Sequence, residues 1–261
     1  MSLVFIESDG VLLNVVSWGS DNRPAFVAHG GWVGNWELWL DPFQLLQDRW
    51  RCIGYDHRGS GVSTAPPEAI EPEALVDDLF AVLDHFQVER CVLAGESLGS
   101  LPCAAAVLRD PSRFAGLVIV DGVPSAGGEP TPIETGAAAD FPGTVEWFVD
   151  ACVPEADSEH IRRWGRQILL RAEAAAAVRI LQAHREQGVA PDWSAIEVPT
   201  LVIHGADDRI VPVAAAEHLA ASVPDSKLVV LPATGHVPTL TRPREVVAAI
   251  DEWWAAAGPA T

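Results

Sequence analysis

The chain has 261 residues, of which 49% are hydrophobic and 20% charged, and its formal net charge is −19. This composition is typical of a globular protein with a sizeable core and excludes an intrinsically disordered chain. The 36 acidic residues outnumber the 17 Lys and Arg, which excludes partners that need a basic surface, such as nucleic acid or an anionic membrane. No uncharged apolar run reaches the ~18 residues of a membrane helix, and no basic segment precedes an apolar one at the N-terminus. We therefore expect no membrane span and no secretion signal.

Eight short apolar runs alternate with longer segments of helical periodicity. The runs that predict strands cover residues 3–6, 11–16, 25–29, 51–55, 91–94, 117–120, 201–204 and 228–231. Apolar residues recur at helical spacing in segments 72–87, 101–108, 214–222 and 243–257. This alternation predicts an α/β fold, with a mostly parallel eight-stranded sheet and helices on both faces. The link Ser8-Asp9-Gly10 is too short for a crossover, so the first two strands should form an antiparallel hairpin.

The interval 122–198 interrupts the alternation, because it is far longer than a crossover between two strands requires. It begins with a segment rich in Pro and Gly and continues with two helical patterns, one around 161–169 and one over 172–187. Ligands of open α/β folds bind at the carboxyl edge of the sheet. We therefore predict a core domain of residues 1–123 and 195–261, and a helical cap of residues 124–194 that covers this edge as a lid.

The four cysteines have neither the spacing of a metal site nor that of a disulfide framework. They are Cys52, Cys91, Cys103 and Cys152, and most have apolar neighbours. We expect buried thiols in a reducing compartment, which predicts a cytoplasmic protein. The sequence leaves open whether the chain is a monomer or a homodimer.

Residues 95–99 have the pattern G-x-S-x-G, between a predicted strand and a predicted helix. A serine in such a tight turn is exposed and rigidly aimed, and the flanking glycines avoid clashes where the chain reverses. The following helix directs N–H groups towards the negative charge that develops on a substrate. Ser97 is therefore the predicted nucleophile.

Further motifs occur in order along the chain: H-G-G-W at 29–32, Y-D-H-R-G-S-G at 55–61, G-A-D-D-R-I-V-P at 205–212 and G-H at 235–236. Together with residues 95–99, they resemble the motifs of the α/β-hydrolase fold superfamily, and the resemblance covers nearly the whole chain. It implies a hydrolase with a Ser-His-Asp triad. Because Ser97 stands where some relatives carry an aspartate, the resemblance disfavours halide displacement and epoxide opening.

The resemblance implies that His236 is the base, and a loop after the last strand can bring an imidazole over the serine turn. Of two adjacent acids, the family's spacing favours Asp208 over Asp207 as the group that orients this histidine. Asp121, which ends a predicted strand, stays open because some relatives take the acid from that place. The resemblance also assigns the oxyanion hole to the backbone N–H groups of Leu98 and Gly31.

Aromatic residues crowd the segment after Gly31 and recur in the insertion. We predict that Trp32, Trp36, Phe141 and Trp147 contact the substrate, although tryptophans at such spacing also occur in cores. The predicted substrate is a small apolar or aromatic ester or lactone. No phosphate loop, dinucleotide motif or metal-ligand cluster is present in the sequence, so we predict neither a cofactor nor a metal.

The leading hypothesis is a serine hydrolase that cleaves a carboxylic ester or lactone through an acyl-enzyme. Carbon–carbon bond hydrolysis, perhydrolysis and acyl transfer use the same three residues and stay open as alternatives. A ligand-sensing protein on a hydrolase scaffold is a further alternative, which a very slow turnover would indicate.

Overall fold

A computed structural model describes residues 1–188 and 190–257. Residue 189 of the predicted cap and residues 258–261 of the predicted core lie outside the described residues. The strands are β1 (Ser2–Ser8), β2 (Val11–Trp18), β3 (Ala25–His29), β4 (Arg51–Tyr55), β5 (Cys91–Glu96), β6 (Phe114–Val120), β7 (Thr200–Gly205) and β8 (Ser226–Leu231). The helices of the sheet layers are α1 (Leu40–Leu46), α2 (Pro72–His85), α3 (Ser100–Arg109), α8 (Val213–Ser222), α9 (Pro238–Thr241) and α10 (Pro243–Ala257).

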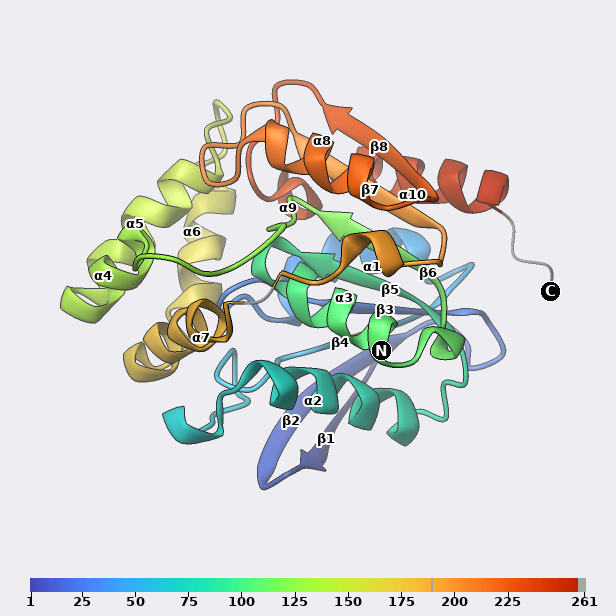
Figure 1. Cartoon of the computed structure of the whole chain (residues 1–261), viewed down its shortest axis with the longest axis horizontal. Coiled ribbons are helices and arrows are strands. Elements are labelled where there is room, and N and C mark those ends of the chain that lie inside the picture. The colour runs from blue at the N-terminus through green and yellow to red at the C-terminus, as the bar shows by residue number, and fades with distance from the viewer. Residues whose placement is uncertain (189, 258–261) are drawn as a thin grey trace.

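All eight strands form one sheet in the order β1-β2-β4-β3-β5-β6-β7-β8. β2 pairs antiparallel with β1 and β4, and the other neighbours pair in parallel. Helices α2, α3 and α8 lie on one face of the sheet, and α1 and α10 lie on the other (Figure 1). The mostly parallel eight-stranded sheet and its antiparallel start are therefore confirmed.

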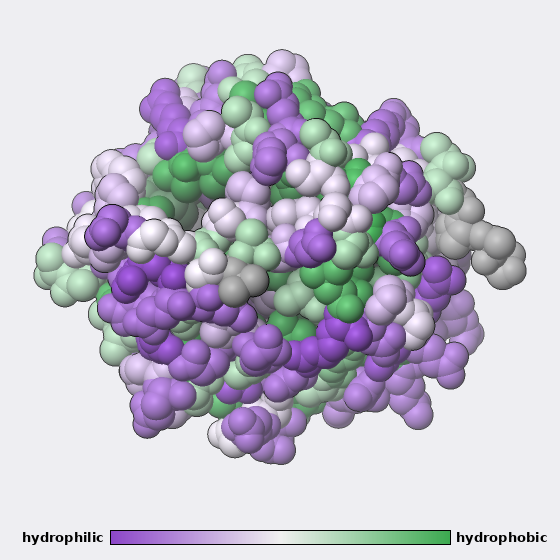
Figure 2. Space-filling model, in the orientation of Figure 1, coloured by the Kyte–Doolittle hydropathy of each residue, from purple (hydrophilic) through white to green (hydrophobic). Residues whose placement is uncertain are grey.

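The centre of the sheet is buried on both faces. Every residue of β3, β5 and β7 is buried, as expected for parallel strands covered by helices. The four cysteines are buried and unbridged. In the orientation of Figure 1, hydrophilic residues gather over the lower half of the visible face, where α2 and α7 lie (Figure 2).

Four helices follow one another between β6 and β7: α4 (Pro132–Ala139), α5 (Phe141–Cys152), α6 (Glu159–Leu169) and α7 (Ala174–Gln187). They lie together at one side of the sheet (Figure 1). The sequence indicated the last two of these helices only. The first two were missed because the segment around 132–143 contains two prolines and two glycines, which weaken a helical pattern. No helix within the described residues is long and apolar enough to cross a membrane.

A buried ion pair fixes the loop after β4 to the sheet layer. The Arg58 guanidinium donates to both carboxylate oxygens of Asp78 in α2, at 2.7 and 2.6 Å, and to the Ala69 carbonyl at 2.7 Å. The side chains of Arg58 and Asp78 are only 1% and 0% exposed. The bidentate geometry compensates for the removal of both charges from water.

We predict that Asp78→Ala lowers the free energy of unfolding by about 3–5 kcal/mol, because it leaves a buried guanidinium without a counter-charge. The neighbouring Asp77 forms an exposed ion pair with Arg109, so Asp77→Ala should cost less than about 1 kcal/mol. Denaturant unfolding of both variants checks this, and equal losses would contradict it.

Candidate active site

Ser97 occupies a sharp turn between β5 and α3. Its φ is +52°, a left-handed conformation that is strained for a residue with a side chain and that recurs at functional sites. The turn is closely packed on both sides. A Cβ at Gly95 would lie 2.7 Å from the Gly99 carbonyl oxygen, and one at Gly99 would lie 2.4 Å from the Gly30 carbonyl oxygen. Both flanking positions therefore require glycine.

The structure brings Ser97, His236 and Asp208 into one hydrogen-bonded chain. His236 Nε2 lies 2.9 Å from Ser97 Oγ, and His236 Nδ1 lies 2.7 Å from Asp208 Oδ2. Because a carboxylate only accepts, Nδ1 carries the proton and donates to Asp208. Nε2 then keeps its lone pair and accepts from the Ser97 hydroxyl. This is the arrangement in which a histidine can take a proton from a serine.

Backbone donors hold Asp208 in this position. Its Oδ1 accepts from the N–H groups of Ile210 at 2.7 Å and Val211 at 2.9 Å. Burial alone would raise the pKa of Asp208. The hydrogen bond and charge of His236, with the two N–H groups, outweigh burial and hold this pKa below its usual value. Asp208 is therefore an ionised partner for the histidine.

Neither of the two competing acids forms a hydrogen bond with His236 among the described residues. Asp207 is exposed and makes no side-chain contact with His236 in the described residues. Asp121 is buried, accepts from the Gly205 N–H at 2.9 Å and lies 3.4 Å from His204 Nδ1. Burial and the neighbouring Asp208 raise the pKa of Asp121 well above its usual value. The geometry thus selects Asp208 as the residue that orients the histidine.

One group of side chains has the chemistry of a metal site. Within the described residues, ligand atoms of Asp121, His204 and Asp208 all lie within 4.8 Å of one another. Asp208 already uses both oxygens for His236 and the backbone, Asp121 Oδ1 accepts from the Gly205 N–H, and His204 Nε2 pairs with the Val211 carbonyl. A cation here would compete with His236 for Asp208, so we assign this cluster a hydrogen-bonding role.

The turn after β3 approaches the serine closely. A Cβ at Gly31 would lie 2.7 Å from Ser97 Cβ and 2.8 Å from the Glu96 carbonyl oxygen, so only glycine fits. His29 supports this turn, because its Nδ1 lies 2.6 Å from the Gly30 carbonyl oxygen and its ring stacks on His57 at 4.8 Å. The backbone of Gly31 and that of Leu98, the residue after Ser97, therefore flank the hydroxyl.

The loop that carries His236 is also bonded to the segment that follows α5. The His236 N–H donates to the Cys152 carbonyl at 2.8 Å, and the Gly235 N–H donates to Glu155 Oε1 at 2.9 Å. Gly235 is again closely packed, since a Cβ there would lie 2.3 Å from the Cys152 carbonyl oxygen. The histidine is thus positioned by the helical insertion as well as by the sheet.

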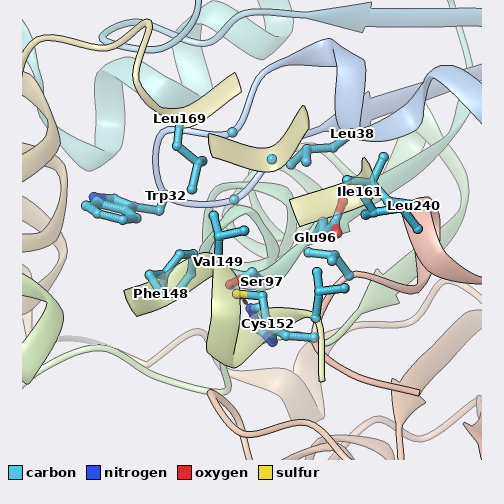
Figure 3. A pocket seen from close by; sticks show the side chains of 16 residues that line it. Trp32, Leu38, Glu96, Ser97, Phe148, Val149, Cys152, Ile161, Leu169 and Leu240 are labelled. Atoms are coloured by element: carbon cyan, nitrogen blue, oxygen red, sulfur yellow. Dashed lines mark hydrogen bonds between the residues drawn. The ribbon is translucent and has the colours of Figure 1, made fainter. Parts of the chain in front are cut away.

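Two cavities meet at Ser97. The first is walled mainly by apolar residues. From the sheet layers come Leu38 and Leu240, and from the insertion come Phe148, Val149, Ile161 and Leu169 (Figure 3). The second shares Trp32, Ser97 and Phe148 with the first and has a more polar wall that includes the ion pair of Glu134 and Arg185.

Of the four predicted substrate contacts, the structure brings only Trp32 to these cavities, and it lines both. The interpretation of the other three as cavity walls is not supported. Trp36 packs against Trp18 with ring centroids 5.3 Å apart, and Phe141 lies behind Trp32 at 6.0 Å. Trp147 is 52% exposed.

Two residues of the cavity wall, Phe148 and Glu96, were not among the four predicted substrate contacts. The buried positions of α5 include Val145, Phe148, Val149 and Cys152, a helical stripe visible in the sequence. That stripe places Phe148 at the cavity and Trp147 on the opposite side of the helix. The second residue is Glu96, which lines the first cavity directly before the nucleophile.

Burial raises the pKa of Glu96 to about 8, from a usual value near 4.5, although a hydrogen bond from Thr239 opposes the shift. The side chain is 1% exposed. An ionised carboxylate loses most of its solvation in such a place, so the neutral acid predominates at neutral pH.

The comparisons with known proteins agree with this geometry. A model described as the alpha/beta hydrolase family matches residues 25–250. The chain is 27% identical to 3-oxoadipate enol-lactonase 2 of Acinetobacter baylyi, over 92% of this chain and 91% of that protein. Among solved structures, it resembles a hydrolase from Pseudomonas aeruginosa with a TM-score of 0.88 and 26% identity, covering 96% and 97% of the two chains. It also resembles a thermophilic esterase from Thermogutta terrifontis with a TM-score of 0.86 and 26% identity, covering 99% and 100%.

We predict that wild type loses stability relative to Glu96→Gln as the pH rises. Between pH 4.5, the usual pKa of a glutamate, and about pH 8, the pKa of Glu96 in the folded protein, the unfolded chain releases a proton that the folded chain retains. Ionisation of Glu96 therefore favours unfolding. From pH 5 to pH 8 the difference in unfolding free energy should grow by about 3 kcal/mol in favour of the glutamine variant. Denaturant unfolding across this range checks it, and a difference that does not change with pH would contradict it.

Proposed function

The chain belongs to the alpha/beta hydrolase family and is a hydrolase enzyme, and from this premise we propose that it cleaves carboxylic esters or lactones through a Ser-His-Asp triad. The observation that carries the proposal is the hydrogen-bonded chain of Ser97, His236 and Asp208 at the junction of two cavities. The names of two similar proteins, an enol-lactonase and an esterase, support this substrate class.

The proposed reaction has two stages. Ser97 Oγ attacks the acyl carbon while His236 Nε2 takes its proton, and the imidazolium then protonates the departing alcohol. The acyl-enzyme that remains is attacked by water, which the same nitrogen deprotonates, and the imidazolium then returns this proton to Ser97 Oγ as the carboxylic acid is released. Asp208 stabilises the imidazolium in both stages because it is ionised and fixed by backbone donors.

The proposed oxyanion hole consists of the N–H groups of Leu98 and Gly31. The close approach of Gly31 to Ser97 supports this assignment, since it brings the Gly31 backbone beside the turn that carries Leu98, where the carbonyl oxygen of an ester attacked by Ser97 would lie. A backbone donor in this role typically lowers the barrier by about 3–4 kcal/mol.

The apolar first cavity and Trp32 favour a small apolar or aromatic substrate. We propose that residues 124–194 act as the cap and that residues 1–123 and 195–261 form the catalytic core, because both cavities contain residues from both parts. The four unbridged thiols support a reducing compartment, so the cytoplasm is the proposed location.

We predict that wild type hydrolyses p-nitrophenyl esters between acetate and decanoate and that Ser97→Ala loses about 10⁴-fold or more of kcat/KM. Spectrophotometric assays of both proteins measure this, and the best chain length reports on the acyl-binding cavity. A wild-type protein that is inactive on every ester and on simple lactones would refute the proposed substrate class.

We predict that Asp208→Asn lowers kcat by about 10³- to 10⁴-fold, because asparagine cannot stabilise the imidazolium or fix its tautomer. Asp207→Asn is the matched control, because the Asp207 side chain is next to Asp208 in the sequence but is exposed. This substitution should change kcat less than about twofold. Similar, modest losses in both variants would show that the acid has been misassigned.

A further inference from the structure

Glu96 is an acid in an otherwise largely apolar wall. Among the residues that line the first cavity, the polar side chains besides Glu96 are those of Ser97 and His236, with the thiol of Cys152. In Figure 3, Glu96 lies on the side of the cavity that holds Leu38, Ile161 and Leu240, away from Trp32 and Phe148. The proposed catalytic reaction gives this carboxyl group no task.

The hydrogen bonds of the carboxyl group are incomplete. The Thr239 hydroxyl donates to Oε1 at 2.9 Å, whereas Oε2 is buried without a partner among the described residues. No ion pair within residues 1–188 and 190–257 includes Glu96, so no cation of that part of the chain compensates a negative charge.

The hydrogen bond from Thr239 indicates which carboxyl oxygen of Glu96 carries the proton. Oε1 accepts from Thr239, and the neutral acid that burial favours then carries its hydrogen on Oε2. The result is an O–H donor in the cavity wall for which the described protein provides no acceptor. Buried donors without acceptors are rare in folded proteins because they forfeit the hydrogen bond they made to water.

We propose that Glu96 is a specificity-determining residue whose Oε2–H donates a hydrogen bond to a neutral oxygen of the substrate. This inference rests on the proposed ester or lactone hydrolysis and narrows its substrate class. The substrate carries a second acceptor oxygen, such as a ketone or an ether, in the part that occupies the first cavity.

Other ligand groups fit this wall less well. A carboxylate in the first cavity would be a buried charge without a counter-ion, because its lining contains no Lys or Arg. A plain alkyl chain would leave the Glu96 donor unpaired after water is displaced. A ketone or ether oxygen pairs the donor and adds no charge. Since Glu96 precedes Ser97 directly, this bond would also orient the ester at the nucleophile.

The test compares matched esters with and without the second oxygen. On the acyl side, p-nitrophenyl 4-oxopentanoate and 5-oxohexanoate are paired with pentanoate and hexanoate. On the alcohol side, 4-oxopentyl acetate is paired with pentyl acetate. Each kcat/KM is divided by the rate constant for hydroxide-catalysed hydrolysis, which removes intrinsic reactivity. Wild type should prefer the oxo ester in at least one pair by about five- to tenfold.

Two variants separate hydrogen bonding from shape. Glu96→Met removes the donor at similar volume and should abolish the preference for the oxo ester, measured as the ratio of kcat/KM within each pair. Glu96→Gln keeps an N–H₂ donor at the same place and should retain most of the preference. Labelling of Ser97 by a fluorophosphonate counts intact sites in each protein, and Glu96→Leu replaces Glu96→Met if the latter does not fold.

The outcomes distinguish this inference from the proposed function. If wild type hydrolyses no ester of either set and no simple lactone, the proposed function itself fails. If wild type hydrolyses the esters without preferring an oxo member, or if Glu96→Met keeps the preference, the inference about Glu96 is overturned and the hydrolase stands. The wild-type comparison alone is decisive against the inference, whatever the variants do.

Discussion

The close contact of two backbone turns is the constraint on which the rest of the site depends. The turn at Gly30 and Gly31 follows β3, and the turn at Ser97 follows the adjacent strand β5. Their backbones approach so closely that a single methyl group at Gly31 or Gly99 would collide with the other turn. Parallel pairing of β3 and β5 places both turns at the same edge of the sheet, so the sheet's register determines where the proposed nucleophile meets its backbone donors.

The hydrogen bonds of the histidines around the site determine their chemical roles. His236 is held at Nδ1 by a carboxylate, which directs its lone pair to Ser97. His29 is held by the Gly30 carbonyl and stacks on His57, and burial lowers the pKa of both rings. These two histidines therefore stay neutral and support the turn.

The features that local sequence patterns encode were predictable, and those that depend on distant contacts were not. Alternating strands and helices, the hairpin of β1 and β2, and the meeting of Ser97, His236 and Asp208 follow from short motifs and their order. The orientation of aromatic side chains depends on which face of an element packs, so Trp36 and Trp147 were assigned to a cavity that they do not line. The environment of Glu96 depends on Thr239, far along the chain in α9, and no pattern near residue 96 indicates that partner.

The two hydrogen bonds between the histidine loop and the segment 152–155 limit how the substrate specificity of this enzyme can evolve. The residue that accepts from the His236 N–H also ends a helix whose side chains form the cavity wall. Rearranging that helix to admit a different ligand therefore shifts the backbone that aims the imidazole, or breaks its bonds. Ligand affinity and histidine geometry are thermodynamically linked through this segment.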